Sequence, residues 1–183
     1  LLNYLALLVW NPGTEQELFS LDSLVKNFDI RKVQKKSAIY DQKKFNWISS
    51  QHLMKEDSDK VLNRLASIAP EWGMHKSQDY LLKVIDLMKP RSNSLSDLIA
   101  QSQYFFSSPK NFDPTQLKKV WKQDTSKKII ALKNDLNSIN SWVAIELESN
   151  IKSFTDQRGI GIGKVMQPMR FLTCGSQKGP TLF

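Results

Sequence analysis

Residues 80–91 have the sequence Tyr-Leu-Leu-Lys-Val-Ile-Asp-Leu-Met-Lys-Pro-Arg. Its apolar residues at helical spacing are Tyr80, Leu81, Val84, Ile85 and Met88. A period of about 3.6 residues places these side chains on one face of an α-helix. Pro90 cannot continue the helix, because proline lacks the N–H and clashes with the preceding turn. The segment therefore predicts an amphipathic helix that ends at a proline corner.

The same helical period continues in both directions along the chain. It indicates further helices over residues 2–9, 18–28, 41–54, 57–70, 94–106, 114–121, 129–136, 142–154 and 165–172. No stretch alternates apolar and polar residues for long enough to demand a strand. The connections are short, and no fixed-period repeat is evident, so neighbouring helices should pack antiparallel or as an irregular superhelix. We therefore expect an all-α fold.

Three short motifs predict where helices begin. Asp41 is suited to cap the helix that follows it, because its carboxylate can accept hydrogen bonds from unpaired amides. Ser94 and Asp97 resemble a capping box, with Asp in place of the more favourable Glu. Asp113-Pro114 combines a capping residue with a proline in the first helical position.

The charge of the chain favours an anionic partner. Lys and Arg number 26 against 18 Asp and Glu, which gives a net charge of +8 and an isoelectric point near 9.5. Such a surplus favours a nucleic acid, because neutralised phosphates release condensed counterions. The alternative is that the charge only keeps a basic protein soluble.

Cysteine and histidine usage argues against disulfides and zinc. Cys174 is the single cysteine, so an internal disulfide is impossible and a reducing, cytoplasmic setting is expected. His52 and His75 are far apart and have no cysteine nearby, so we expect no metal site. The longest apolar run, residues 5–10, is too short to span a bilayer. Leu1 is not an initiator methionine, and no basic n-region precedes the apolar stretch that begins the sequence, so we expect a piece of a longer protein rather than a secretory signal.

The glycine-spaced segment 159–164 fails the tests for a nucleotide site. A phosphate-binding loop needs glycine where Arg158 stands and Ser or Thr where Val165 stands. A dinucleotide fingerprint would need glycine at Lys164. We therefore expect a flexible turn before a helix.

No other catalytic constellation is evident in the sequence. The acid pairs Asp57 with Asp59, and Glu146 with Glu148, lie two residues apart and so face different sides of a helix. We expect no catalytic residue, metal site or cofactor in this chain.

The tryptophans could stack on unpaired bases or pack in the core. Because four of the five lie in or beside apolar helical patterns, core packing is the expectation for each: Trp10, Trp47, Trp72, Trp121 and Trp142.

Three separated stretches resemble glutamyl-tRNA synthetases of the bacterial and organellar type. Residues 2–10 are similar to the leucine-rich helix that follows the catalytic lysine signature, with Val9 in place of a usual glycine. Residues 28–48, from Phe-Asp-Ile to Lys-Phe-Asn-Trp-Ile, match a second conserved segment of that family, after which Ser49 replaces a usual Asn. Residues 163–183, from Gly-Lys-Val-Met-Gln-Pro-Met-Arg to Gly-Pro-Thr-Leu-Phe, match its closing signature, with Cys174 in place of a usual threonine.

The resemblance implies a stem-contact helical segment at residues 1–55, followed by anticodon-binding helical units at residues 56–112 and 113–183. Glutaminyl-tRNA synthetases use β-barrels there instead. The full-length protein would be a class I glutamate–tRNA ligase that uses ATP and magnesium in a catalytic part outside this chain. This chain alone would be inactive and would supply selectivity for the anticodon loop and inner stem of tRNA(Glu). A cytoplasmic monomer is expected, with no membrane or DNA partner.

The resemblance also assigns candidate base contacts. Residues 88–91 match a motif whose arginine contacts the third anticodon base, where cytosine rather than guanine separates glutamate from glutamine tRNAs. On a rigid corner, the planar guanidinium of Arg91 can donate two hydrogen bonds to O2 and N3 of a pyrimidine. The alternative is an ordinary helix-end arginine.

Four further candidates lie near the C-terminus. Gln167 and Arg170 match anticodon-contacting positions and are three residues apart, hence on one helix face, which could also be only a solvated polar face. Gly179, where the family usually has threonine, and Leu182 match a loop that holds the first anticodon base.

Lysine pairs are candidate phosphate contacts, without a choice among them: Lys35-Lys36, Lys43-Lys44, Lys118-Lys119 and Lys127-Lys128. The rival function is a helical protein-interaction module with a basic surface and no role in RNA binding.

Overall fold

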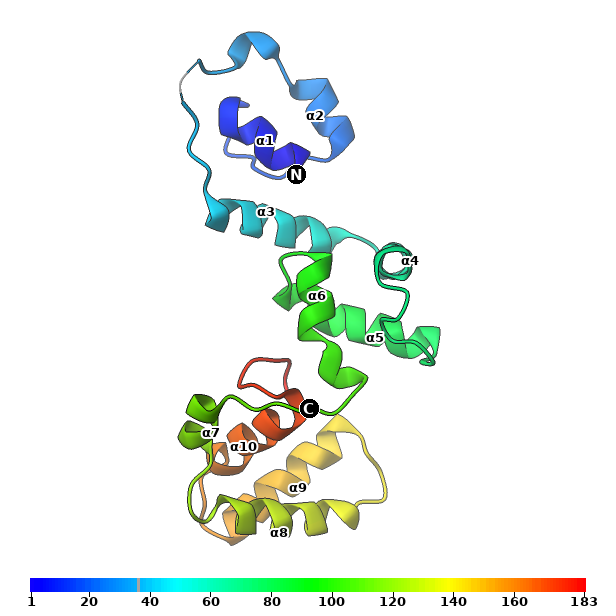
Figure 1. Cartoon of the computed structure of the whole chain (residues 1–183), viewed down its shortest axis with the longest axis vertical. Coiled ribbons are helices and arrows are strands. Elements are labelled where there is room, and N and C mark those ends of the chain that lie inside the picture. Colours follow the sequence, from blue (N-terminus) through cyan, green and yellow to red (C-terminus); the bar gives the residue numbers. More distant parts are fainter. Residues whose placement is uncertain (36) are drawn as a thin grey trace. The chain divides into compact units, whose positions relative to one another are not determined.

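The computed structural model describes residues 1–35 and 37–183, so that Lys36 of the first lysine pair lies outside the described residues. Within these residues there are ten α-helices, short 3-10 turns and no strand, and the single backbone bridge joins Trp10 to Val33. The all-α prediction is confirmed. The chain forms two compact units, residues 1–102 and residues 103–183 (Figure 1). The finer division at residues 55/56 and 112/113 stays a prediction.

Among its described residues, unit 1 contains six helices, which follow the predicted segments closely. They are α1 (Leu2–Val9), α2 (Leu21–Asn27), α3 (Gln42–Lys55), α4 (Ser58–Ile68), α5 (Gln78–Met88) and α6 (Leu95–Gln101), with 3-10 turns at Ile30–Lys32 and Lys89–Arg91. One apolar cluster joins Trp10, Phe19 and Leu24. The helices α4 and α5 pack together, and their fully buried residues include Val61, Leu65 and Ile85.

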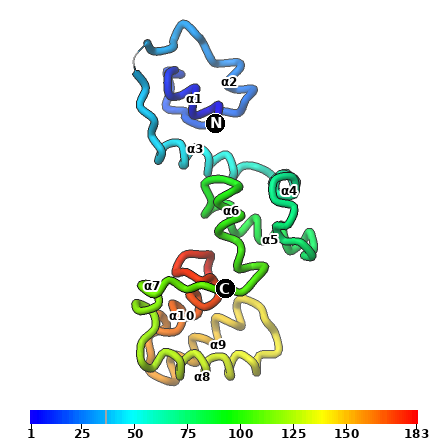
Figure 2. Tube along the Cα trace, in the orientation of Figure 1, coloured from blue at the N-terminus to red at the C-terminus, as the bar shows by residue number. Residues whose placement is uncertain are grey.

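Unit 2 contains a 3-10 turn at Gln103–Phe105 and the helices α7 (Pro114–Val120), α8 (Thr125–Asn137), α9 (Ala144–Gln157) and α10 (Gly163–Cys174). Helix α8 packs against α9, and α10 packs against both α7 and α8, as Figure 2 shows in its trace of this unit. The core cluster of the unit consists of Leu132, Leu136, Ile151, Phe154 and Val165. These residues hold α10, which bears two of the candidate base contacts.

The predicted helix starts are confirmed by their hydrogen bonds. The carboxylate of Asp41 accepts from the amides of Lys43 and Lys44, and that of Asp113 accepts from the amides of Thr115 and Gln116. These backbone donors hold the pKa of Asp113 below its ordinary value, since they stabilise the charged form.

The capping box at α6 differs from its expected form by one residue. The Ser94 hydroxyl accepts from the Asp97 amide at 3.1 Å, as expected. The Asp97 carboxylate reaches the amide of Asn93 at 2.9 Å rather than that of Ser94. The Asp97 carboxylate therefore accepts from the residue that precedes the N-cap, not from the N-cap residue itself.

The tryptophan expectation was wrong at two positions. Trp10 and Trp72 are buried, but Trp47 is 43% exposed and Trp142 is 67% exposed. Trp142 lies two residues before α9 begins, so the apolar pattern extended past the helix. Trp47 precedes the buried Ile48 and is turned about 100° from it around α3.

Candidate nucleic-acid interface

Helix α10 separates a buried face from a polar one. Val165, Pro168 and Phe171 are buried at spacings of three residues. Gln167 is exposed and Arg170 is partly buried, so both lie away from the fully buried face. Because the buried residues occupy one face of α10, the hydrogen-bonding side chains of Gln167 and Arg170 lie outside that face.

The segment after α10 folds back onto Arg170. Gly175 ends the helix with φ of +72°, where an added Cβ would lie 3.0 Å from Cβ of Pro109. One guanidinium N–H of Arg170 donates to the carbonyl oxygen of Gly179 at 3.3 Å. Gly179 has φ of +151°, and a Cβ there would lie 3.2 Å from Sγ of Cys174. A side chain larger than hydrogen would thus strain this turn.

Two of the predicted contacts are therefore neighbours in space. Arg170 and Gly179 share a hydrogen bond, while Leu182 is partly buried farther along the same loop. The last residue, Phe183, packs against the core cluster of unit 2. The loop is fixed at both ends by contacts within its own unit.

Arg91 lies in unit 1, at the corner predicted from Pro90. Helix α5 ends at Met88, and Lys89–Arg91 form a 3-10 turn. Arg91 is exposed, and its Nη1 donates to the carbonyl oxygen of Leu87 at 2.9 Å. Arg91 therefore makes the contact expected of an ordinary helix-end arginine. That contact uses one of the five N–H donors of the guanidinium.

Lys89 holds the corner that bears Arg91. Its partly buried ammonium donates to the carbonyl oxygen of Glu56 at 2.5 Å and to the Ser58 hydroxyl at 3.1 Å. Glu56 follows α3 and Ser58 begins α4, so one side chain joins the end of α5 to the junction between two other helices.

We expect Lys89→Met to lower the free energy of unfolding by about 1 kcal/mol, because it removes a hydrogen bond to the partly buried Glu56 carbonyl. Urea unfolding followed by circular dichroism measures this change. Lys83→Met is the matched control on α5, since Lys83 is 76% exposed in its pair with Asp79. Equal losses in the two variants would show that Lys89 does not hold the corner.

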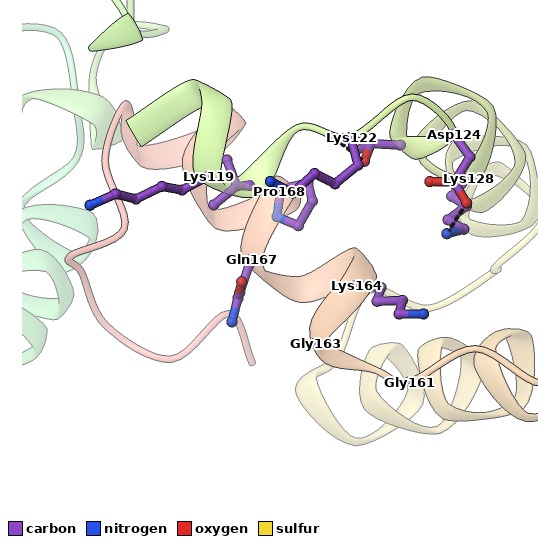
Figure 3. A pocket seen from close by; sticks show the side chains of 11 residues that line it. Lys119, Lys122, Asp124, Lys128, Gly161, Gly163, Lys164, Gln167 and Pro168 are labelled. Atoms are coloured by element: carbon purple, nitrogen blue, oxygen red, sulfur yellow. Dashed lines mark hydrogen bonds and ion pairs between the residues drawn. The ribbon is translucent and has the colours of Figure 1, made fainter. Parts of the chain in front are cut away.

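A basic groove opens in unit 2 between the α7–α8 turn and the start of α10 (Figure 3). Its volume is about 480 Å³, and its charged lining residues are Lys119, Lys122, Lys128, Lys164 and Asp124. Gln167 also lines it. The groove thus brings one predicted base contact together with four lysines from separate segments.

Only two of these four lysines were among the candidates predicted from the sequence. Lys119 and Lys128 belong to the lysine pairs named as candidates, but Lys122 and Lys164 were not considered as RNA contacts. Lys122 follows Lys118 by one helical turn, and its ammonium donates to the Lys118 carbonyl oxygen at 2.9 Å. The four-residue spacing between Lys118 and Lys122 could have identified Lys122 from the sequence. The position of Lys164 depends instead on how α10 packs on α7 and α8.

The described residues contain no cluster of metal-ligating side chains. In residues 1–35 and 37–183, no group of three or more His, Cys, Asp and Glu side chains could hold a metal ion. An added Cβ at Gly161 or Gly163 would meet nothing within 4 Å, so no contact with the described residues requires glycine at either position. Over the same residues, no helix is long and apolar enough to cross a membrane.

The helical fold, its basic groove and its exposed Arg and Gln side chains are features that helical RNA-binding modules share. A family model described as an anticodon binding domain matches residues 60–183. The chain belongs to this anticodon-binding domain family.

The relatives and solved structures agree with that assignment. The glutamate–tRNA ligase of Flavobacterium psychrophilum is 36% identical over 182 residues, which is 100% of this chain and 36% of that protein. The glutamate–tRNA ligase of Porphyromonas gingivalis is 34% identical over 99% of this chain and 36% of its own length. The crystal structure of a glutamate tRNA ligase from Elizabethkingia meningosepticum in complex with its amino acid aligns with a TM-score of 0.85 at 30% identity, over 99% of this chain and 36% of that one. The chain therefore spans about a third of the length of these relatives.

Proposed function

We propose that this chain is the anticodon-reading part of a glutamate–tRNA ligase and that it binds the anticodon loop and inner stem of tRNA(Glu). The observation that supports this most strongly is similarity to glutamate–tRNA ligases along 99–100% of the chain. The activation of glutamate with ATP and magnesium, and its transfer to the tRNA, would take place in a part of the protein outside this chain. The protein would act as a monomer in the cytoplasm.

The proposed division of labour is a stem-contact segment at residues 1–55 and anticodon-binding units at residues 56–112 and 113–183. The proposed base contacts are Arg91, Gln167, Arg170, Gly179 and Leu182. Single-stranded loop bases are splayed out and expose their edges to side chains, which suits recognition of this kind.

Each proposed contact has a physical role. Arg91, on its proline corner, would donate two hydrogen bonds to the third anticodon base, which favours cytosine over guanine. Gln167 can both donate to and accept from a base edge. Arg170 would pair with or stack on a base while it holds the Gly179 carbonyl, and Leu182 would contact a base through its apolar side chain.

A filter-binding titration tests the proposal. The 183-residue chain is titrated with tRNA(Glu) and with an unrelated tRNA over a range of salt concentrations. Tighter binding to tRNA(Glu), which weakens as salt rises, is expected, since backbone contacts release counterions. Absence of binding to either RNA at low salt would support the protein-interaction module instead.

A further inference from the structure

The lysines of the basic groove are only partly neutralised by the protein. Asp124 forms an ion pair with Lys128, one helical turn away. The hydrogen bond from Lys128, together with the positive charge of Lys164, lowers the pKa of the Asp124 carboxyl. Among the described residues, no carboxylate lies within ion-pair distance of Lys119, Lys122 or Lys164. Three of the four lysines are therefore available to an external anion.

The groove carries the positive charge of its lysine side chains, and two amides at the start of α10 are already hydrogen-bonded within the protein. The amide of Lys164 donates to Gly161, and that of Val165 donates to Ile162, at 2.9 and 3.1 Å. These first-turn donors are thus already used within the protein. An anion in the groove would be held by the lysine ammonium groups, which make point-charge contacts to phosphate.

The charges are spread along the groove rather than gathered at one point. In Figure 3, the side chains of Lys119 and Lys164 point toward opposite ends of the opening. The lining contains no aromatic side chain, and its larger apolar residues, Val120 and Pro168, are outnumbered by four lysines, unlike the mainly apolar lining of small-molecule pockets. An extended polyanion, with charges at intervals, fits this arrangement better than one compact anion.

We propose that the groove binds the phosphodiester backbone of RNA, beside the nucleotide whose base Gln167 contacts. This inference rests on the proposed function, because it takes the ligand to be the anticodon arm of a tRNA. Gln167 lines the groove one helical turn after Gly163 and Lys164. One surface could therefore bind a base through Gln167 and the phosphates next to that base through the lysines. The lysines would add affinity for any sequence, and Gln167 would add selectivity.

The test uses the double variant Lys119→Gln/Lys164→Gln. Both side chains are exposed, and neither has an internal ion pair among the described residues, so the fold should be retained. The matched control is Lys110→Gln/Lys133→Gln, which removes the same charge from exposed lysines of unit 2 that do not line the groove. Circular dichroism checks the fold of each variant.

Dissociation constants for the tRNA(Glu) anticodon stem–loop are measured over a salt series. The groove variant is expected to bind about tenfold more weakly at about 0.1 M salt, with a slope of log affinity against log salt that is smaller by about 1.5–2, because two lysine contacts are removed. The loss should be equal for stem–loops with altered anticodon bases, because phosphates do not encode sequence. The control variant should keep the slope of the unmodified chain.

A scan of single methylphosphonate linkages locates the contact. Neutralising one or two adjacent phosphates should weaken binding to the unmodified chain but cause no further loss in the groove variant, as expected for coupled partners. Unchanged affinity and slope in the groove variant would overturn the inference, even if the chain still prefers tRNA(Glu). Saturable binding of inorganic phosphate at constant ionic strength, lost in the groove variant while RNA binding is unchanged, would assign the site to a free anion and also overturn it.

The same measurements can contradict the proposed function without contradicting the role of the groove. A reduced salt slope in the groove variant, together with equal affinity of the unmodified chain for all anticodons, would support the groove and contradict anticodon reading. Absence of RNA binding at low salt would contradict both.

Discussion

Phe154→Ala is expected to lower the free energy of unfolding of this chain by about 3–5 kcal/mol, the usual cost of deleting a large buried aromatic side chain. Phe154 is 2% exposed in the cluster that joins α8, α9 and α10. The guanidinium of Arg158 also lies 3.9 Å from the centre of its ring. The truncation would leave a cavity beneath α10, and urea unfolding followed by circular dichroism would measure the loss.

Ile145→Ala is the matched control for this variant. It also shortens a large apolar side chain on α9, but Ile145 is 77% exposed, so the change should stay within about 0.5 kcal/mol. If the two variants were destabilised equally, the cluster around Phe154 would not be the core of unit 2.

Arg91→Gln is expected to reduce discrimination between cytosine and guanine at the third anticodon position by about 1–3 kcal/mol. This corresponds to a change of roughly 5- to 150-fold in the ratio of two dissociation constants. The physical reason is the loss of the planar pair of donors, since a glutamine amide cannot reproduce the guanidinium fork. Binding of two anticodon stem–loops that differ only at this base measures the ratio.

Arg64→Gln provides the control for charge. Arg64 is an exposed arginine of the same unit and pairs with Glu56 at 2.5 Å. Any effect of its charge on RNA affinity should be the same for both stem–loops, because a phosphate contact carries no base information. An Arg91→Gln variant whose discrimination ratio equals that of the unmodified chain would remove Arg91 from the anticodon site.

Local interactions explain why the helices were predictable. The apolar spacing in residues 80–88 and the caps at Asp41 and Asp113 depend on contacts within about one helical turn, so the residue order alone specifies them. The corner at Pro90 follows from the absent N–H of proline. The mismatch of residues 158–165 with nucleotide-binding motifs can likewise be seen from the order of the residues alone.

Exposure was less predictable than helix formation. Trp47 and Trp142 belong to apolar patterns, yet both are exposed, because burial depends on which face of an element meets a neighbour. The bond between Arg170 and Gly179 joins the helix α10 to a turn in the left-handed region, which spacing alone does not specify.

The all-α class, the helix boundaries near their caps and the basic charge follow from the order of the residues, and resemblance adds the five candidate base contacts. By contrast, the meeting of Lys119, Lys122, Lys128 and Lys164 with Gln167 in one groove depends on how the helices pack. The groove combines residues 119–128 with residues 161–168, which are distant in the chain and meet because α10 packs on α7 and α8. Helices form through contacts close in sequence, whereas a binding surface depends on the non-local packing of those helices.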